Sequence, residues 1–189
     1  HSPPGCLTAT FVFPADEDLS LEQLPLLAGL ALREAVVRLC GDERIALKWP
    51  NDLLWRGRKL AGVLCERFDR LDLVGVGLNV NVQDRSLPPD LRGRTASLAA
   101  IARRELPMTQ ILIEVGRSLA SAVAARHGTL FSQTARRFEE HHCLRGRRVA
   151  VSTAQGVVRG RCEGIDQRGR LLVRARGRIH RLNSGHVAG

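Results

Sequence analysis

The segment Lys48-Trp49-Pro50-Asn51-Asp52 places a cation, an amide and a carboxylate around a proline-fixed bend, at the end of a short predicted strand. Ligands often bind where strands end, and proline makes such a bend rigid. A lysine there can neutralise phosphate charge during nucleotidyl transfer, while an asparagine and an aspartate can hydrogen-bond a ligand or a metal-bound nucleotide. The structural alternative for a bare Asn-Asp pair is a turn closed by an Asx cap.

Lysine is rare in this chain, because only Lys48 and Lys59 among its 29 basic residues are lysines. Surface positive charge is therefore carried by arginine. We expect the two lysines at positions where a compact, flexible ammonium group is needed and a planar guanidinium does not serve. Chance is the alternative explanation, since two residues are a small sample.

Two further segments combine small residues with a predicted strand. Residues 58–64 (Arg-Lys-Leu-Ala-Gly-Val-Leu) follow a tight turn, and residues 75–81 (Gly-Val-Gly-Leu-Asn-Val-Asn) hold two glycines and end in asparagines. Glycine weakens a strand, and a flat ligand lying close to the backbone is one reason to find it there. Three of the chain's four asparagines fall in residues 48–52 and 75–81.

Apolar periodicity predicts the elements that position these motifs. The predicted strands cover residues 8–13, 45–47, a hairpin turning at Arg56-Gly57, and 71–80, the last buried on both faces. The predicted helices run from a Ser20–Gln23 capping box to Gly41, from a cap at residues 95–97 to 104, from Thr109 to near Gly128, and over 130–140. From Leu144 onward, four or five short strands in about 45 residues predict a small β-barrel, which places a domain boundary near residue 143.

The composition is that of an ordinary soluble globular protein, with 189 residues, 44% of them hydrophobic and 25% charged. No apolar run approaches the length of about 18 residues that a membrane span needs, and no signal peptide opens the chain. The five cysteines are scattered and odd in number, which predicts reduced thiols in a cytoplasm. His141-His142-Cys143 is expected to be a helix end and not a metal site, because adjacent helical residues point in different directions.

The net charge of +10 fits either nucleic acid or acidic partners such as ATP and carboxylate-rich proteins. The charge is spread along the chain, with modest clusters at residues 145–148 and 174–181. No aromatic residues that could stack on bases interleave with these clusters. Nucleic-acid binding is therefore not expected as the main function.

Residues 48–52, 57–64 and 75–81 resemble successive motifs of the biotin protein ligases, in the family's order and close to its usual spacing. Thr95-Ala96-Ser97-Leu98 also fits, and residues 144–189 resemble the family's SH3-like C-terminal domain through residues 164–166 and 169–172. The resemblance implies an α+β fold. A mixed sheet flanked by helices would form a biotin/lipoyl ligase-like catalytic domain over residues 1–143, and residues 144–189 would form a small SH3-like β-barrel.

The resemblance also implies a two-step ligase. The biotin carboxylate would attack the α-phosphate of Mg-ATP to give biotinyl-5′-AMP and pyrophosphate, and a lysine of a biotin carboxyl carrier protein would then attack the mixed anhydride. ATP, Mg²⁺ and biotin are the implied cofactors and substrates, the carrier protein is the implied partner, and a homodimer is compatible with the family. No membrane partner is expected.

Motif matching implies a role for each matched residue. Lys48 is expected to be the catalytic residue and to contact the biotin carboxylate and the phosphate. The residues expected along biotin, through their backbone, are Leu53, Gly62, Gly75 and Gly77. Those expected at ATP are Asn51, Asp52, Lys59 and Asn79. No protein-bound metal site is expected.

Two departures from the family pattern leave alternatives open. The family's glycine/arginine-rich loop and its Ser-Thr segment lie upstream of the position that matches Ser2-Pro3, so the catalytic domain is expected to be N-terminally incomplete here. His186 stands where the family commonly has an acid. A lipoate ligase shares the Asn-Asp…Gly-Arg-Lys stretch, although Lys48-Trp49-Pro50 and residues 77–81 favour biotin. A third hypothesis, besides a biotin ligase and a lipoate ligase, is a non-catalytic binding or regulatory module.

Overall fold

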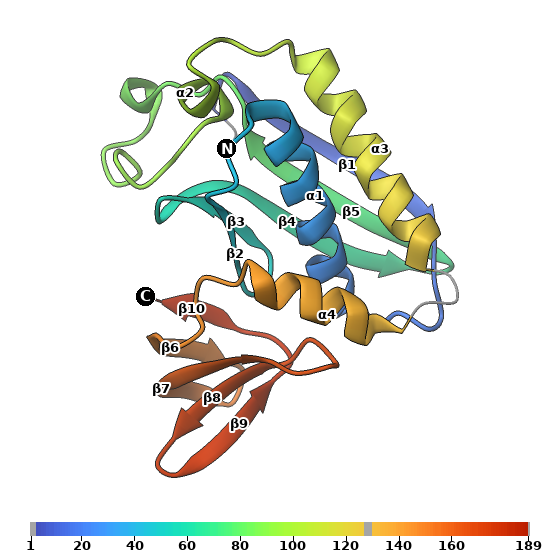
Figure 1. Cartoon of the computed structure of the whole chain (residues 1–189), viewed down its shortest axis with the longest axis vertical. Helices are drawn as coiled ribbons and strands as arrows, with labels where there is room; N and C mark the ends of the chain where they lie inside the picture. Colours follow the sequence, from blue (N-terminus) through green and yellow to red (C-terminus); the bar gives the residue numbers. More distant parts are fainter. Residues whose placement is uncertain (1–2, 127–129, 189) are drawn as a thin grey trace.

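The chain is described by a computed structural model, which covers residues 3–126 and 130–188 and forms two sheets, four α-helices and one short 3-10 helix, η1 (Asp84–Ser86), in those ranges (Figure 1). The larger sheet, here called sheet A, has the strand order β1-β5-β4-β3-β2. Its strands are β1 (Cys6–Pro14), β2 (Ile45–Lys48), β3 (Asp52–Trp55), β4 (Arg58–Phe68) and β5 (Leu71–Asn79).

The strand ladders of sheet A are all antiparallel, which confirms the α+β class but corrects the expectation of a mixed sheet. Short connections join β2 to β5 as a meander, and consecutive strands joined in this way must run antiparallel. Parallel pairing is limited, among the described residues, to the isolated bridges Leu47–His142 and Lys59–Thr95. The predicted hairpin turn is present, with Arg56 and Gly57 both at positive φ.

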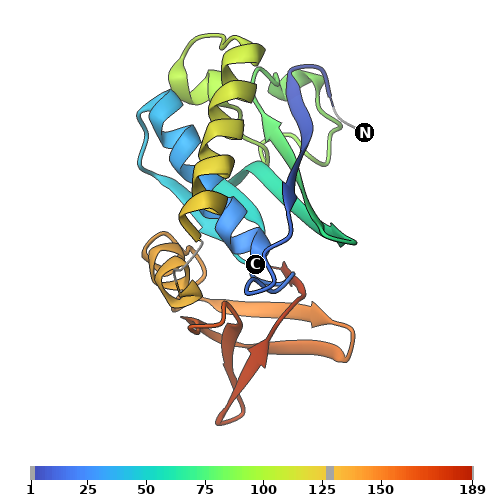
Figure 2. The same cartoon turned by 90° about the vertical axis from the view of Figure 1, so that its right-hand side faces the viewer.

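Helices cover one face of sheet A. Helices α1 (Leu24–Cys40) and α3 (Met108–Arg126) lie across the same side of the sheet (Figures 1 and 2). The strands consequently alternate: in β5, Asp72, Val74, Val76 and Leu78 are buried, whereas the residues between them are partly exposed. The prediction that residues 71–80 are buried on both faces is therefore wrong, and the second face of the sheet is open.

Helix ends follow the predicted capping chemistry with small shifts. The Ser20 N–H donates to Gln23 Oε1 at 3.1 Å, although α1 itself begins at Leu24, and Gly41 ends it in the left-handed conformation. The Ser97 hydroxyl caps α2 (Leu98–Ala102) by accepting from the Ala100 N–H. The predicted end of the α3 helix near Gly128 lies outside the described residues.

The last helix, α4 (Phe131–Glu140), leads into the second sheet, here called sheet B. Sheet B has the order β10-β6-β7-β8-β9 and is antiparallel throughout. Its strands are β6 (Arg148–Thr153), β7 (Gly156–Ile165), β8 (Leu171–Ala175), β9 (Arg178–Leu182) and β10 (His186–Ala188). This arrangement is consistent with an SH3-like domain, while closure into a barrel and the boundary at residue 143 stay predictions.

All five cysteines are free thiols. Within residues 3–126 and 130–188, no helix combines the length and apolar character needed to cross a bilayer.

Candidate active site on the open face of sheet A

A single row of residues crosses the open face of sheet A. The strand register places Thr8 opposite Gly77, Gly77 opposite Gly62, Gly62 opposite Asp52, and Asp52 opposite Lys48. Directly opposed residues of antiparallel strands share a face. This cross-strand row therefore brings the three sequence motifs together, and each of its five members is partly or fully exposed.

The middle of the row is bare backbone. A Cβ atom added at Gly77 would meet nothing closer than the Gly62 carbonyl oxygen at 4.0 Å. A Cβ at Gly62 would lie 3.2 Å from Asp52 Oδ1, and one at Gly75, a position further along β5, would lie 3.3 Å from the Leu64 carbonyl oxygen. A flat ligand can thus approach the peptide groups here directly, as the glycine spacing predicted.

A β-bulge directs Lys59 onto the same face. The register between β3 and β4 shifts so that Leu53 pairs with Ala61 but Leu54 pairs with Lys59, which leaves Leu60 as the extra residue. Leu60 and Ala61 are both buried, and Lys59 Nζ lies 2.5 Å from Asp52 Oδ1. Both lysines of the chain therefore lie beside Asp52, at the charged end of the glycine floor.

The other predicted site residues differ in what their side chains do. Asn51 Nδ2 donates to the Val63 carbonyl at 2.7 Å, which ties the Lys48–Asp52 bend to β4. Asn79 lies on the open face, where its Nδ2 donates to the Lys59 carbonyl at 3.3 Å. Leu53 is fully buried on the helix side, so only its backbone can reach a ligand. The ligand contacts expected of these residues stay predictions.

Trp49 has a role that sequence reasoning missed. Its side chain is 1% exposed, and its Nε1–H donates to the carbonyl of Gly169, at 3.0 Å, in the turn between β7 and β8. Asp166 holds this turn by accepting from the backbone N–H groups of Arg168 and Arg170. The acceptor is 120 residues from Trp49 in the sequence, which is why no local pattern indicated the contact.

The residue on the other side of Lys48 is also fixed by the C-terminal part of the chain. The Leu47 N–H donates to the His141 carbonyl at 2.9 Å, and the Cys143 N–H donates to the Leu47 carbonyl at 2.9 Å. Burial raises the pKa of the Cys143 thiol, an effect that the nearby positive charges of Arg147 and Lys48 partly oppose. Lys48 is thus held between two neighbours that both bond to segments beyond residue 140.

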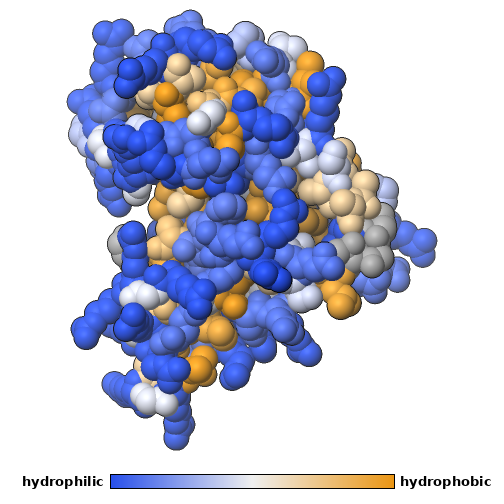
Figure 3. Space-filling view, viewed as in Figure 1, coloured by the Kyte–Doolittle hydropathy of each residue, from blue (hydrophilic) through white to orange (hydrophobic). Residues whose placement is uncertain are grey.

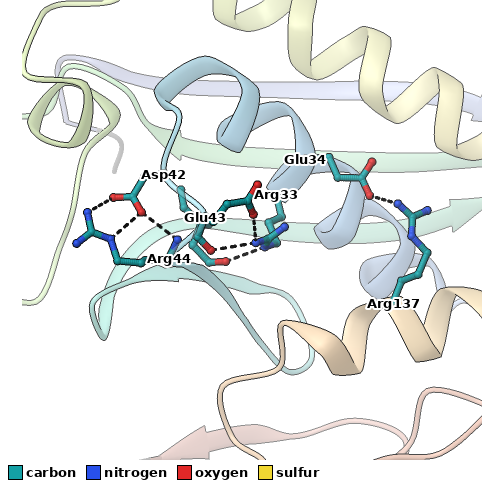
Figure 4. A network of polar contacts seen from close by, with 7 residues as sticks. Arg33, Glu34, Asp42, Glu43, Arg44 and Arg137 are labelled. Atoms are coloured by element: carbon teal, nitrogen blue, oxygen red, sulfur yellow. Dashed lines mark hydrogen bonds and ion pairs between the residues drawn. The ribbon is translucent and has the colours of Figure 1, made fainter.

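A buried arginine fixes the start of β2, three residues before Lys48 (Figure 4). Arg33, on α1, donates from Nε to the Ile45 carbonyl at 2.7 Å and from Nη2 to the Glu43 carboxylate at 2.8 Å. Nearby, hydrogen bonds from Arg44 hold the pKa of the Asp42 carboxyl well below its usual range. The contacts of Arg33 set where the strand that carries Lys48 begins.

A separate groove of about 540 Å³ lies between α1, α3 and α4, on the helix side of sheet A. Its charged residues largely pair with one another, as Arg38 with Glu114 and Arg137 with Glu34. No cluster of three or more His, Cys, Asp or Glu side chains able to hold a metal occurs in the described part of the chain. The cross-strand row is therefore the strongest candidate site.

Two family models match the chain. Residues 1–82 match the biotin/lipoate A/B protein ligase family, and residues 145–188 match the biotin protein ligase C terminal domain. The first defines the class, a ligase fold shared by biotin and lipoate enzymes. The second, with the relatives described next, is specific: the chain belongs to the biotin protein ligase family.

Curated relatives include the biotin–[acetyl-CoA-carboxylase] ligase of Mycobacterium tuberculosis, 33% identical over 167 residues, covering 87% of this chain and 61% of that protein. The bifunctional ligase/repressor BirA of Bacillus subtilis is 27% identical over 172 residues, covering 87% of this chain and 52% of that protein. The chain thus spans between 52% and 61% of the length of these relatives.

Solved structures show the same fold. The biotin protein ligase of Aquifex aeolicus superposes with a TM-score of 0.87 at 26% identity, covering 97% of this chain and 81% of that chain. The same enzyme in complex with biotin and ATP gives a TM-score of 0.86 at 26% identity, covering 97% and 78%.

Proposed function

We propose that the protein activates biotin with ATP to form biotinyl-5′-AMP and transfers the biotin to a lysine of a biotin carboxyl carrier protein. The observation that carries this proposal is the cross-strand row, in which a floor of bare glycine backbone ends at two lysines placed around one aspartate. The complex of the Aquifex relative with biotin and ATP supports it, because that chain has the same fold.

In the first step, an oxygen of the biotin carboxylate attacks the α-phosphorus of Mg-ATP, and the bond to pyrophosphate breaks. Negative charge grows on the phosphate oxygens in the transition state, so a fixed ammonium group there lowers the barrier. Lys48 supplies that group from the end of β2. Lys59, restrained by Asp52, would add a second positive charge at the phosphates, and Asn79, on the same open face, would hydrogen-bond the adenine.

In the second step, the amine of the carrier lysine attacks the acyl carbon of the mixed anhydride, and AMP leaves with the bonding electron pair while the amine loses a proton. Lys48 again stabilises the charge that develops on the leaving phosphate. In this proposal the acyl group lies on the open face of sheet A, and the carrier protein approaches it from the side opposite α1 and α3.

Three readings of the site make different predictions for ATP–pyrophosphate exchange by the complete protein. A biotin ligase exchanges pyrophosphate in the presence of biotin. A lipoate ligase exchanges it with lipoate and not with biotin, which would contradict the proposal. A non-catalytic module binds ligand without any exchange, a result that isothermal titration calorimetry with biotin would reveal.

The location and assembly of the protein are parts of the same proposal. Five free thiols are in keeping with a reducing compartment, and we propose the cytoplasm. Analytical ultracentrifugation with and without biotin and ATP tests for a homodimer.

A further inference from the structure

The positive charge of the chain is concentrated in its C-terminal quarter. Residues 144–189 hold eleven arginines against two acidic residues, so they carry +9 of the net charge of +10. Residues 1–143 are nearly neutral by comparison. The sequence pattern suggested an even spread, because the catalytic part also contains many arginines, but there acidic residues balance them.

Sheet B gathers five of these arginines on one face. The register places Arg148 of β6 opposite Arg161 of β7, and Arg161 opposite Arg174 of β8. Neighbouring strands lie about 4.8 Å apart, and like charges directly opposite each other destabilise a sheet. Arg159 lies two positions before Arg161 on β7, so it is on the same face. Arg181 of β9 is on this face as well, because it lies opposite Leu172, two positions before Arg174 on β8. We call these five residues the arginine face.

Little within the chain compensates this charge. Among the described residues, the arginine face makes one ion pair, between Arg174 and Glu163 at 3.0 Å. Arg148, Arg159, Arg161 and Arg181 are exposed and form none. A row of like charges that costs stability and lacks internal counter-ions is expected where an external partner supplies them.

The residues between the arginines indicate the kind of partner. Val157 and Ile179 lie on the same face, 48% and 37% exposed, and Ile179 continues the row opposite Arg174. Residues 144–189 contain no Phe, Trp or Tyr, so no such aromatic ring is present to stack on bases. Arginine mixed with aliphatic side chains is typical of protein interfaces, whereas a nucleic-acid backbone calls for cations and polar groups alone. In Figure 3 the lower part of the molecule, which sheet B forms, is largely hydrophilic and is broken by small apolar areas.

The arginine face also begins close to the candidate active site. Cys143 pairs with Leu47, the residue before Lys48, and Arg148 follows Cys143 by five residues. Five residues span at most about 18 Å even when fully extended. A folded protein domain is wide enough to contact Arg148 while one of its loops reaches Lys48.

We propose that the arginine face of sheet B docks an acidic surface of the protein substrate. This inference rests on the proposed function, which requires a protein acceptor, and adds where and by what chemistry that acceptor is held. Carboxylates of the acceptor would pair with the guanidinium groups, and Val157 and Ile179 would pack against its apolar residues.

The test compares two triple variants that lose the same charge. The row variant, R148Q/R161Q/R174Q, removes the three directly opposed arginines of the arginine face. The control variant, R70Q/R117Q/R136Q, removes three exposed arginines outside sheet B that make no ion pair in the described chain. The measurements are biotin-dependent pyrophosphate exchange and the KM of a purified biotin carboxyl carrier domain in the transfer reaction, at low and high salt.

For the row variant we expect the KM for the carrier to rise about tenfold at low salt, with a smaller rise at high salt. Pyrophosphate exchange should be unchanged, because it needs no carrier. The control variant should change the KM by less than about twofold. The thermal midpoint of the row variant should not fall, since the substitutions relieve repulsion between opposed arginines.

An unchanged KM in the row variant, or an equal rise in both variants, would overturn the proposal. So would a row variant that keeps its carrier KM but loses affinity for a short DNA duplex, a result that assigns the face to nucleic acid. If the unmodified protein shows no exchange with biotin, the proposed function fails separately, and calorimetric binding of the carrier domain still tests the face.

Discussion

Lys48 and Gly77 contribute opposite properties to the cross-strand row: one brings charge and the other brings the absence of a side chain. Each stood out in the sequence for its type and strand context, and the resemblance to the biotin protein ligases grouped them into one site. Neither signal revealed the partners of Trp49 and Asn51, which are Gly169 and Val63. Those bonds depend on how distant segments pack, which no local pattern encodes.

Lys48→Ala is expected to lower biotin-dependent pyrophosphate exchange by about 100-fold or more, since in the proposed mechanism its ammonium group stabilises the charge of the transition state. Lys48→Arg should fail to restore activity, because a planar guanidinium cannot take the position of a compact ammonium. Urea unfolding should show an unchanged stability, as Lys48 is partly exposed. Full pyrophosphate exchange in the alanine variant would show that Lys48 does not have the proposed catalytic role.

Gly77→Ala tests whether a ligand lies on the glycine floor. The added methyl group meets no protein atom closer than 4.0 Å, so the fold should tolerate it and the thermal midpoint should hold. It projects onto the open face, so the KM for biotin should rise about tenfold or more. Gly29→Ala is the matched control, because its methyl group would lie 3.7 Å from Leu47 Cδ2 on the helix side. Equal kinetics in the two variants would mean that biotin binds elsewhere.

At the scale of elements, the sequence predicted where strands and helices lie better than it predicted how they pair. The hairpin, the α1 cap at Gly41 and the strands of sheet B follow from turn and capping residues. The exposed side of β5 was missed, because its apolar run reads as fully buried when Leu71 and Leu73 are counted without knowing which face the helices cover. The bulge at Leu60 was missed as well, since two consecutive buried residues leave no period-two signal.

Arg33 connects helix α1 to the start of β2, and the placement of that strand depends on it. Arg33→Met leaves the buried Ile45 carbonyl without its donor and should lower the free energy of unfolding by about 2 kcal/mol. The matched control is Arg44→Met on the adjoining loop, where the arginine is exposed and bonds only Asp42, so stability should hardly change. Urea denaturation of both variants makes the comparison, and an equal loss would show that Arg33 is no anchor.

At the scale of the whole molecule, the two sheets are joined at the residues on either side of Lys48. The Leu47 pairing with residues 141–143 and the Trp49–Gly169 hydrogen bond make the geometry of Lys48 depend on the C-terminal part of the chain. The family resemblance supplied both parts, but no local sequence pattern indicated this connection.

Trp49→Phe keeps the ring but removes the buried N–H donor. We expect faster hydrogen exchange in the turn at residues 166–170 and a lower kcat for pyrophosphate exchange with little change in the KM for biotin, because Lys48 loses its fixed neighbour. Trp55→Phe is the control, since Trp55 donates to Asp42 at 2.9 Å and not to the C-terminal part of the chain. If both variants behave alike, contact with the C-terminal turn does not position Lys48.

Trp49 also gives the molecule an optical reporter. The chain has two tryptophans and no tyrosine, and Trp55 lies beneath the guanidinium groups of Arg56 and Arg58. Trp55→Phe therefore leaves a single fluorophore, buried where the two sheets meet. Its emission would shift to longer wavelength whenever the C-terminal turn moves away and admits water, so separation of the two sheets could be followed in real time without any attached label.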